Sequence, residues 1–120
     1  MFPEKINVTS IESVLYVSRD RHPECVTRFY GPMCANELIF HLSGDATVTF
    51  NGTVMRTVED TVRYLPRTEI SEYKVVRDAP GECIDIFFNT DVPLSNTAFL
   101  LNFAGNQSLK AHFRKIHSTW

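Results

Sequence analysis

Two side chains that can bind metals or small molecules lie within one short run of this sequence. Glu37 and His41 are four residues apart in ELIFHL. Side chains alternate between the two faces of a β-strand, so this carboxylate and imidazole point to the same side, about 13 Å apart. Ligands of one metal ion lie about 2 Å from it, so these two residues are too far apart to share an ion.

Other reactive signatures are missing. The sequence has no GxSxG elbow, no phosphate-binding loop and no GxGxxG turn, so nothing in it requires an enzyme. Its three cysteines, Cys25, Cys34 and Cys83, are odd in number and form no CxxC motif. We therefore expect reduced, buried and inert thiols rather than disulfides or a zinc site. We expect no cofactor.

The composition describes one globular domain. The chain has 120 residues, of which 43% are apolar, with nine Phe and four Tyr, which is enough for a hydrophobic core. Its net charge of −2 makes a nucleic-acid-binding face unexpected within these residues. The N-terminus does not resemble a signal peptide and no apolar run is long enough to span a bilayer. We expect a cytoplasmic protein without a membrane partner.

The apolar residues follow a period of two through most of the chain, which predicts β-strands. Eight short runs about ten residues apart, separated by turn signals, are typical of a β-sandwich or barrel. Asn51-Gly52 lies between two of them and predicts a type I′ hairpin, since both residues tolerate positive φ. The runs are SVLYV (13–17), CVTRFY (25–30), ELIFHL (37–42), ATVTF (46–50), TVMRTV (53–58), TVRYL (61–65), SEYKVV (71–76) and CIDIFF (83–88).

The pattern changes near the C-terminus. DVPLSNTAFLLNF predicts a connector or an edge strand, because Pro93 does not suit a central strand. SLKAHFRKIHSTW predicts a helix that Asn106 or Ser108 caps. We therefore expect a barrel over residues 8–104 and an amphipathic helix over 106–120, within a single domain.

One face of that helix is apolar. Four large residues form a single stripe, and an uncovered stripe of this kind marks an interface, most simply between two copies related by a two-fold axis. Alternatively, the helix folds back onto its own barrel. The stripe runs to the last residue, so we expect the chain to be cut from a longer helical region. Its residues are Leu109, Phe113, Ile116 and Trp120.

Two segments fit a known barrel motif. The spacing Glu37-x6-Gly44 matches the second half of the first cupin motif. With Pro66 set on the proline of the second motif, Gly-x5-Pro-x-Gly-x2-His-x3-Asn, Ser71 falls at its histidine and Val75 at its asparagine. The chain therefore resembles a cupin, which implies a mainly β, jelly-roll barrel (a double-stranded β-helix) followed by at least one C-terminal helix.

Most of the metal ligands that the cupin motifs supply are replaced. The His-x-His pair of the first motif falls among Tyr30, Gly31, Pro32 and Met33, and the second-motif histidine is Ser71. Glu37 alone remains, and one carboxylate cannot hold a transition metal that needs three or four donors. The resemblance thus implies a barrel without a native metal site.

The resemblance also implies which side chains face the barrel interior. The cupin carboxylate slot points inward, so Glu37 and residues of its parity line the interior, together with residues of the Ser71 parity on another strand. Apolar walls with a few polar groups suit a small polar ligand. Alternatively, Glu37 and His41 bond to local backbone and only stabilise the barrel. The predicted ligand-binding residues are Tyr30, Glu37, Ile39, His41, Ser71 and Tyr73.

Other polar side chains have simpler interpretations. Arg63 and Arg67 could attract an anionic ligand, but a solvated strand face is the expected setting for both. Asp85 in CIDIFF is expected on the solvent side of an amphipathic strand. Tyr30 is either a pocket residue or a core aromatic.

The run ELIFHLSGDATVTFNG, followed by TVRYLP, also resembles the sensor domain of AraC-type transcription regulators. The resemblance covers residues 25–120 and implies an effector-sensing and dimerisation domain. Its partners would be a small metabolite, sugar-like or otherwise polar, and a second copy bound through the C-terminal helix. DNA would be bound by a helix-turn-helix module outside these residues. The alternatives are a small stand-alone cupin enzyme, such as an isomerase, epimerase or dioxygenase, and a binding domain whose side chains fill the barrel.

Overall fold

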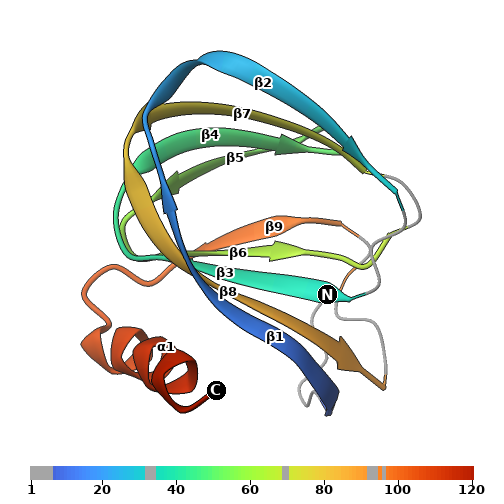
Figure 1. Ribbon diagram of the computed structural model, residues 1–120, viewed down its shortest axis with the longest axis vertical. Helices are drawn as coiled ribbons and strands as arrows, with labels where there is room; N and C mark the ends of the chain where they lie inside the picture. Colours follow the sequence, from blue (N-terminus) through green and yellow to red (C-terminus); the bar gives the residue numbers. More distant parts are fainter. Residues whose placement is uncertain (1–6, 32–34, 69–70, 92–94, 96) are drawn as a thin grey trace.

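The computed structural model describes residues 7–31, 35–68, 71–91, 95 and 97–120. Within them the chain forms strands that pair only in antiparallel fashion, and one C-terminal helix (Figure 1). The expected mainly β class with a C-terminal helix is confirmed. The elements are β1 (Val8–Arg19), β2 (His22–Tyr30), β3 (Asn36–His41), β4 (Asp45–Phe50), β5 (Thr53–Val58), β6 (Thr61–Leu65), β7 (Ser71–Ala79), β8 (Gly81–Thr90), β9 (Phe99–Asn102) and α1 (Gln107–Thr119).

The strands form two sheets that face each other. One has five strands in the order β1-β8-β3-β6-β9, and the other has four in the order β2-β7-β4-β5. Most neighbours within a sheet are far apart in sequence, so the chain crosses repeatedly between the layers (Figure 1). β9 lies at an edge of its sheet, as predicted from the proline in the sequence DVPLSNTAFLLNF. Two facing sheets bury the apolar side of each other, which is the usual solution for an all-β chain.

The hairpin between β4 and β5 forms as predicted. Asn51 has φ 45° and Gly52 has φ 85°, the pair of positive values that a type I′ turn requires. The Asn51 side chain also accepts a hydrogen bond of 2.8 Å from the backbone N–H of Glu72 on β7. This contact ties the hairpin to its neighbouring strand.

The central strands of the larger sheet bury both of their faces. On β3, Phe40 points outward into a cluster that helix α1 covers, while Ile39 points inward into a second cluster between the sheets. On β8, Ile84 and Ile86 belong to the outer cluster and Cys83 to the inner one. The alternation of these strands therefore separates two apolar layers rather than a core from solvent.

Helix α1 packs on the outer face of the five-stranded sheet. The Asn106 side chain caps it by accepting from the Leu109 backbone N–H at 3.0 Å, as predicted. Phe113 stacks on Phe40 with ring centroids 4.7 Å apart and is 7% exposed. The prediction of an uncovered stripe is thus wrong for Phe113, and Leu109 also packs against the outer cluster. Ile116 and Trp120, 38% and 59% exposed, are the uncovered members.

Two turns approach each other at the backbone level. Gly44, in the turn after β3, has φ 113°, and Gly81 begins β8. A Cβ added to Gly81 would lie 2.7 Å from the Ser43 carbonyl oxygen, which is closer than real Cβ contacts allow. A Cβ added to Gly44 would likewise lie 2.9 Å from Gly81 Cα, so the motif glycine at position 44 is needed both for its positive φ and because a second backbone passes directly against it.

We predict that Gly81→Ala lowers the free energy of unfolding by roughly 1–3 kcal/mol, since backbone must move to admit the methyl group. Gly31→Ala is the matched control, because a Cβ there meets nothing within 4 Å and its φ is not positive. Its effect should stay within about 0.5 kcal/mol. Urea unfolding followed by circular dichroism measures both, and equal midpoints for the two variants would contradict the close approach.

Candidate ligand cavity

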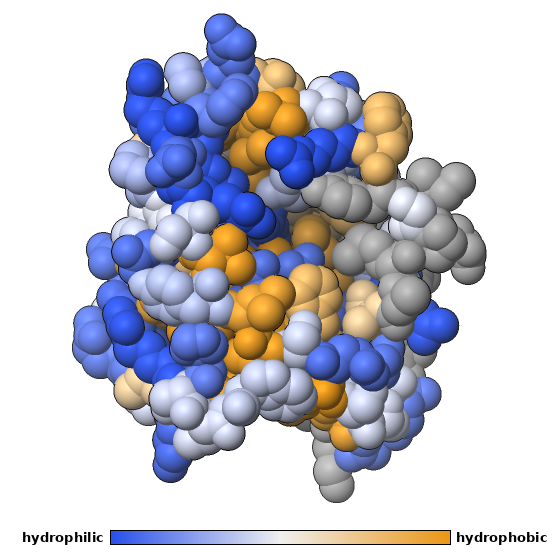
Figure 2. Space-filling model, in the orientation of Figure 1, coloured by the Kyte–Doolittle hydropathy of each residue, from blue (hydrophilic) through white to orange (hydrophobic). Residues whose placement is uncertain are grey.

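A cavity of about 770 Å³ lies between the two sheets. This volume is in the range of pockets that hold small molecules. Figure 2 shows the molecule hollowed between the sheets, with hydrophilic and apolar side chains together around the opening. The lining residues are Leu15, Val17, Arg19, Asp20, Arg21, His22, Val26, Arg28, Gly31, Glu37, His41, Phe50, Arg63, Leu65, Tyr73, Val75, Arg77, Cys83, Asp85 and Phe87.

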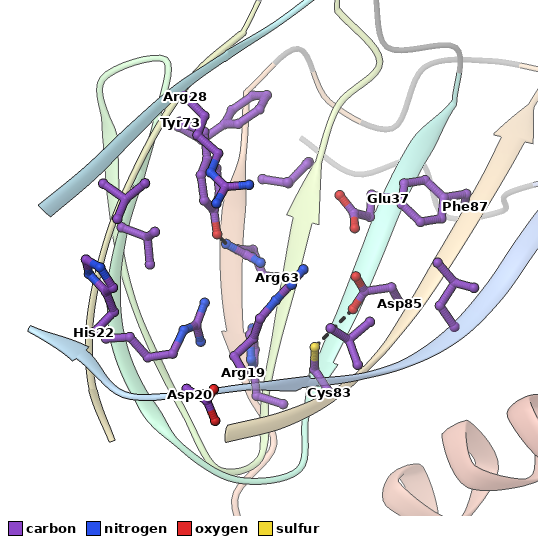
Figure 3. Close-up of a pocket in the computed structure, with 18 of the residues that line it drawn as sticks. Arg19, Asp20, His22, Arg28, Glu37, Arg63, Tyr73, Cys83, Asp85 and Phe87 are labelled. Atoms are coloured by element: carbon purple, nitrogen blue, oxygen red, sulfur yellow. Dashed lines mark hydrogen bonds between the residues drawn. The ribbon is translucent and has the colours of Figure 1, made fainter. Parts of the chain in front are cut away.

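Arg63 and Tyr73 form a polar bridge between the two sheets. Arg63 on β6 donates through Nη1 to the Tyr73 hydroxyl on β7 at 2.9 Å, and its guanidinium lies 5.5 Å from the Tyr73 ring centroid (Figure 3). Arg63 is 7% exposed, and its Nε has no hydrogen-bond partner among the described residues. Burial opposes its charge, but Tyr73 and the nearby carboxyl groups outweigh burial and raise its pKa. Arg63 is therefore a buried cation with an unused donor.

Glu37 and Asp85 form a buried carboxyl pair opposite these groups (Figure 3). Burial raises the pKa of Glu37 to about 8, and the charge of Asp85 and a hydrogen bond with it add to the shift. Arg63 and Arg19 act in the other direction but do not cancel it. Two carboxyl groups in one dry site cannot both ionise freely. Glu37 is therefore protonated at neutral pH.

Cys83 belongs to the same group. Its thiol donates to Asp85 Oδ1 at 3.2 Å, and burial raises its pKa to about 12. The side chain is thus a neutral thiol at neutral pH, which suits the predicted inert role. The expectation of buried cysteines is wrong for Cys25, which is exposed, and Cys34 lies outside the described residues.

His41 lines the cavity from the end of β3. Burial, followed by the positive charges of Arg63 and Arg77, lowers its pKa to about 3. The imidazole is therefore neutral in the physiological range, and its buried Nε2 has no hydrogen-bond partner within the described part of the chain. A polar atom in this position normally bonds to a protein group, a water or a ligand.

The structure brings together half of the predicted ligand-binding residues. Glu37, His41 and Tyr73 line the cavity, and so does Val75, which has the predicted parity. Ile39 points inward as expected, but it pairs with Arg63 on one side and Asp85 on the other and is only 1% exposed. It therefore belongs to the apolar cluster beneath the cavity rather than to its wall.

The other two predicted residues are Ser71 and Tyr30. Ser71 is fully buried at the start of β7 and does not line the cavity. The side chain of Tyr30 lies outside the described part of the structure, although its backbone pairs with Ser71.

The expected settings of Arg63 and Asp85 are wrong. Both were assigned to solvated strand faces, yet they are 7% and 9% exposed and point into the cavity. The physical reason is that the other face of their sheet is covered by α1, so the polar side of the alternation faces inward. Arg67, for which a solvated setting was also expected, is exposed.

Sequence reasoning missed the cationic character of the site. Arg19, Arg28 and Arg77 come from β1, β2 and β7 and reach the same cavity as Arg63. Each lies two residues along its strand from a side chain that also lines the cavity, such as Val17 for Arg19 and Val75 for Arg77. Parity was therefore a usable signal, but it required knowing that β7 and the two N-terminal strands β1 and β2 enclose one space.

Metal binding has little support in this arrangement. Among the described residues, no group of three or more His, Cys, Asp and Glu side chains lies close enough to hold an ion. Glu37, Asp85 and His41 share the cavity wall with five arginines, whose guanidinium groups repel a cation. The side chains fit an organic ligand better than a metal.

Comparisons with known proteins give only the fold. Neither a family model nor a curated protein matches the sequence. A solved structure of the plu4264 protein from Photorhabdus luminescens is similar, with a TM-score of 0.51 and 14% sequence identity. The similarity covers 63% of this chain and 61% of that chain, which is less than two thirds of the neighbour's length. In the described parts of the present structure, no helix has the length and apolar character needed to cross a membrane.

The buried carboxyl pair predicts a stability that depends on pH. Glu37 has a folded-state pKa of about 8 against an ordinary 4.5, so between these values the folded protein holds a proton that the unfolded chain has released. Stability therefore falls as pH rises through this range. His41, with a pKa lowered from 6.5 to about 3, acts in the opposite sense, but only below 6.5. Between pH 6.5 and 8, Glu37 acts without it.

In that window we expect the wild type to lose roughly 1–2 kcal/mol of stability and Glu37→Gln to lose much less, because the amide does not titrate. Chemical denaturation at several pH values measures the difference. Glu24→Gln, at an exposed position, is the control and should follow the wild type. Parallel pH profiles for the wild type and Glu37→Gln would refute the protonated pair.

Proposed function

We propose that this chain is a ligand-sensing domain that binds a small molecule inside its barrel, as in AraC-type transcription regulators. The observation that carries the proposal is the cavity itself, with its unused polar atoms. Arg63 Nε and His41 Nε2 are buried in it without hydrogen-bond partners among the described residues. Leaving such groups unpaired costs about 1–3 kcal/mol each, and a ligand that bonds to them recovers this energy.

The strand order supports the jelly-roll assignment. The first eight strands divide between the sheets as β1-β8-β3-β6 and β2-β7-β4-β5, so consecutive strands repeatedly cross between the layers. Eight strands in two such sheets characterise jelly rolls, to which cupins belong. The AraC assignment itself rests on the sequence resemblance around ELIFHLSG and implies a DNA-binding module outside these residues.

The packing of α1 supports a sensing role. β3 places His41 in the cavity and the preceding Phe40 against Phe113 of the helix. β1 likewise places Leu15 in the cavity and Tyr16 beside His117, with ring centroids 5.6 Å apart. A ligand that shifts β3 or β1 therefore also moves Phe40 or Tyr16, and through that ring it acts on the helix. Such a coupling signals to the helix that the cavity is occupied, provided that the ligand binds one of two helix positions more tightly than the other.

The proposal predicts that a compound from a library of small metabolites raises the melting temperature in a dose-dependent manner. Val26→Trp should abolish the effect, since Val26 lines the cavity and the added indole would fill it. Val54→Trp is the control, because Val54 is 67% exposed on β5 and outside the cavity. The function is rejected if no compound binds, or if every binder acts equally on both variants.

An enzyme of the cupin type is the second candidate, and the carboxyl pair favours it. A carboxyl group with a pKa near 8 next to a second carboxyl can act as a general acid or base close to neutral pH. A binding domain returns its ligand unchanged, whereas an isomerase or epimerase converts it. Incubating each compound that binds with the protein, and then recording the NMR spectrum of the compound, distinguishes a binding domain from an enzyme.

Dimerisation through α1 stays a prediction that now rests on Ile116 and Trp120. We expect a dimer at micromolar concentration and a monomer after Trp120→Ser or Ile116→Ser, as measured by light scattering. Val54→Ser, which removes an exposed apolar side chain elsewhere, should remain dimeric. Phe113→Glu is not a clean test, because Phe113 lies in the core of its own protomer. A monomeric wild type would contradict the prediction.

A further inference from the structure

The charge of the cavity is opposite to that of the chain. The whole sequence has a net charge of −2, yet five of its eight arginines line this one space. Three carboxyl groups, Asp20, Glu37 and Asp85, accompany them, which leaves a formal excess of two positive charges. Since Glu37 is protonated at neutral pH, the actual excess is larger. A cavity with this balance attracts anions.

Among the described residues, the cavity arginines form no ion pair with a carboxylate. Ion pairs elsewhere bring carboxylates within 4 Å of Arg56, Lys74 and Lys110. Burying a guanidinium costs several kcal/mol unless a counter-charge and hydrogen bonds compensate. Arg19, Arg21 and Arg28 are exposed to solvent, and Arg21 Nε donates to the Asp78 carbonyl oxygen at 3.0 Å, so the cost of burying an unpaired charge falls mainly on Arg63 and Arg77. Arg63, the most buried of them, hydrogen-bonds the Tyr73 hydroxyl but forms no ion pair with a described carboxylate.

The positive groups converge on one part of the cavity. Figure 3 shows Arg63 and Tyr73 side by side, with Arg19 and Arg28 reaching toward the same space and the carboxyl pair on the opposite side. Arg77 is half-buried on β7, two residues from Val75. The low pKa of His41, which Arg63 and Arg77 help to lower, is consistent with a positive potential there. Planar guanidinium groups around one point match the geometry of a carboxylate or phosphate.

Much of the rest of the wall is apolar. Phe50, Leu65 and Val75 line the same cavity as the arginines and the carboxyl pair. A bare inorganic ion would leave these side chains and much of the 770 Å³ without contacts. The wall therefore suits a molecule that has a carbon skeleton as well as an acid group.

We propose that the cavity binds a small organic anion, a carboxylate or phosphate ester, whose acid group contacts Arg63 and Arg77 and whose carbon skeleton lies against Phe50, Leu65 and Val75. This inference rests on the proposed function and narrows it from a polar metabolite to an acidic one. The neutral Glu37 side chain, on the far side, is placed to hydrogen-bond a hydroxyl or carbonyl of the same molecule.

Matched compounds that differ mainly in charge test the proposal. The panel contains gluconate, glucose and glucosamine, and then benzoate, benzamide and benzylamine, all at constant ionic strength. Glucose 6-phosphate and phenyl phosphate distinguish phosphate esters from carboxylates, and inorganic phosphate tests the need for a carbon skeleton. Thermal shift identifies binders, and titration calorimetry gives their Kd.

We expect at least one organic anion to bind while its neutral and cationic counterparts do not. Arg63→Gln and Arg77→Gln should each raise its Kd roughly 10- to 100-fold, the usual loss for a charge-assisted hydrogen bond. Arg67→Gln removes the same charge from an exposed site outside the cavity and should leave the Kd unchanged. If Arg63→Gln does not fold, Arg77→Gln and Arg19→Gln carry the test.

Different results overturn different claims. The inference fails if no organic anion binds, if a neutral or cationic counterpart binds as tightly, or if Arg67→Gln weakens binding as much as Arg77→Gln. Equal affinity for inorganic phosphate overturns the role of the apolar wall. A neutral or cationic binder that Val26→Trp blocks rejects the anion but leaves the proposed function in place. Failure of both the panel and the metabolite library rejects both.

Discussion

The five-stranded sheet has no face toward solvent along its central strands, and the other features of the molecule follow from this constraint. Helix α1 covers one side through Phe113, and the four-stranded sheet encloses the other. Strict alternation on β3, β6 and β8 then sends every second side chain into the space between the sheets. Polar residues on those strands cannot reach solvent freely, so they must satisfy one another or a bound molecule.

The electrostatics of the cavity reflect this enclosure. Tyr73 and the neighbouring carboxyl groups outweigh burial and raise the pKa of Arg63, whereas burial, with the charge of Asp85 added, raises the pKa of Glu37. Burial, followed by the charges of Arg63 and Arg77, lowers the pKa of His41 and keeps its imidazole neutral. The groups are thus set to different protonation states by their positions, and the site as a whole is positive. A binding domain and an acid–base catalyst both use such an arrangement, and the unpaired arginines favour recognition of an anion.

Local signals in the sequence predicted the secondary structure well because they depend on nearest neighbours. The eight apolar runs, the positive φ values of Asn51-Gly52 and the Asn106 cap all act over a few residues, and each appears where it was expected. Parity, combined with the inward direction that the cupin resemblance implies, placed Glu37, His41 and Tyr73 on the cavity wall, where they lie, but also Ile39 and Ser71, which do not line it. It failed for Arg63 and Asp85 because alternation tells which residues share a face, not whether that face meets water.

The sequence by itself therefore determined the strands, their turns, the helix and the sidedness of each residue within its own strand. Tertiary structure alone decided which faces enclose a common space, since β1, β2, β6, β7 and β8 reach the cavity from distant parts of the chain. It also decided which residues of the helix stripe are buried, because Phe113 packs against the surface around Phe40. The charge balance inside the barrel depends on these long-range strand pairings, which no local sequence pattern predicts.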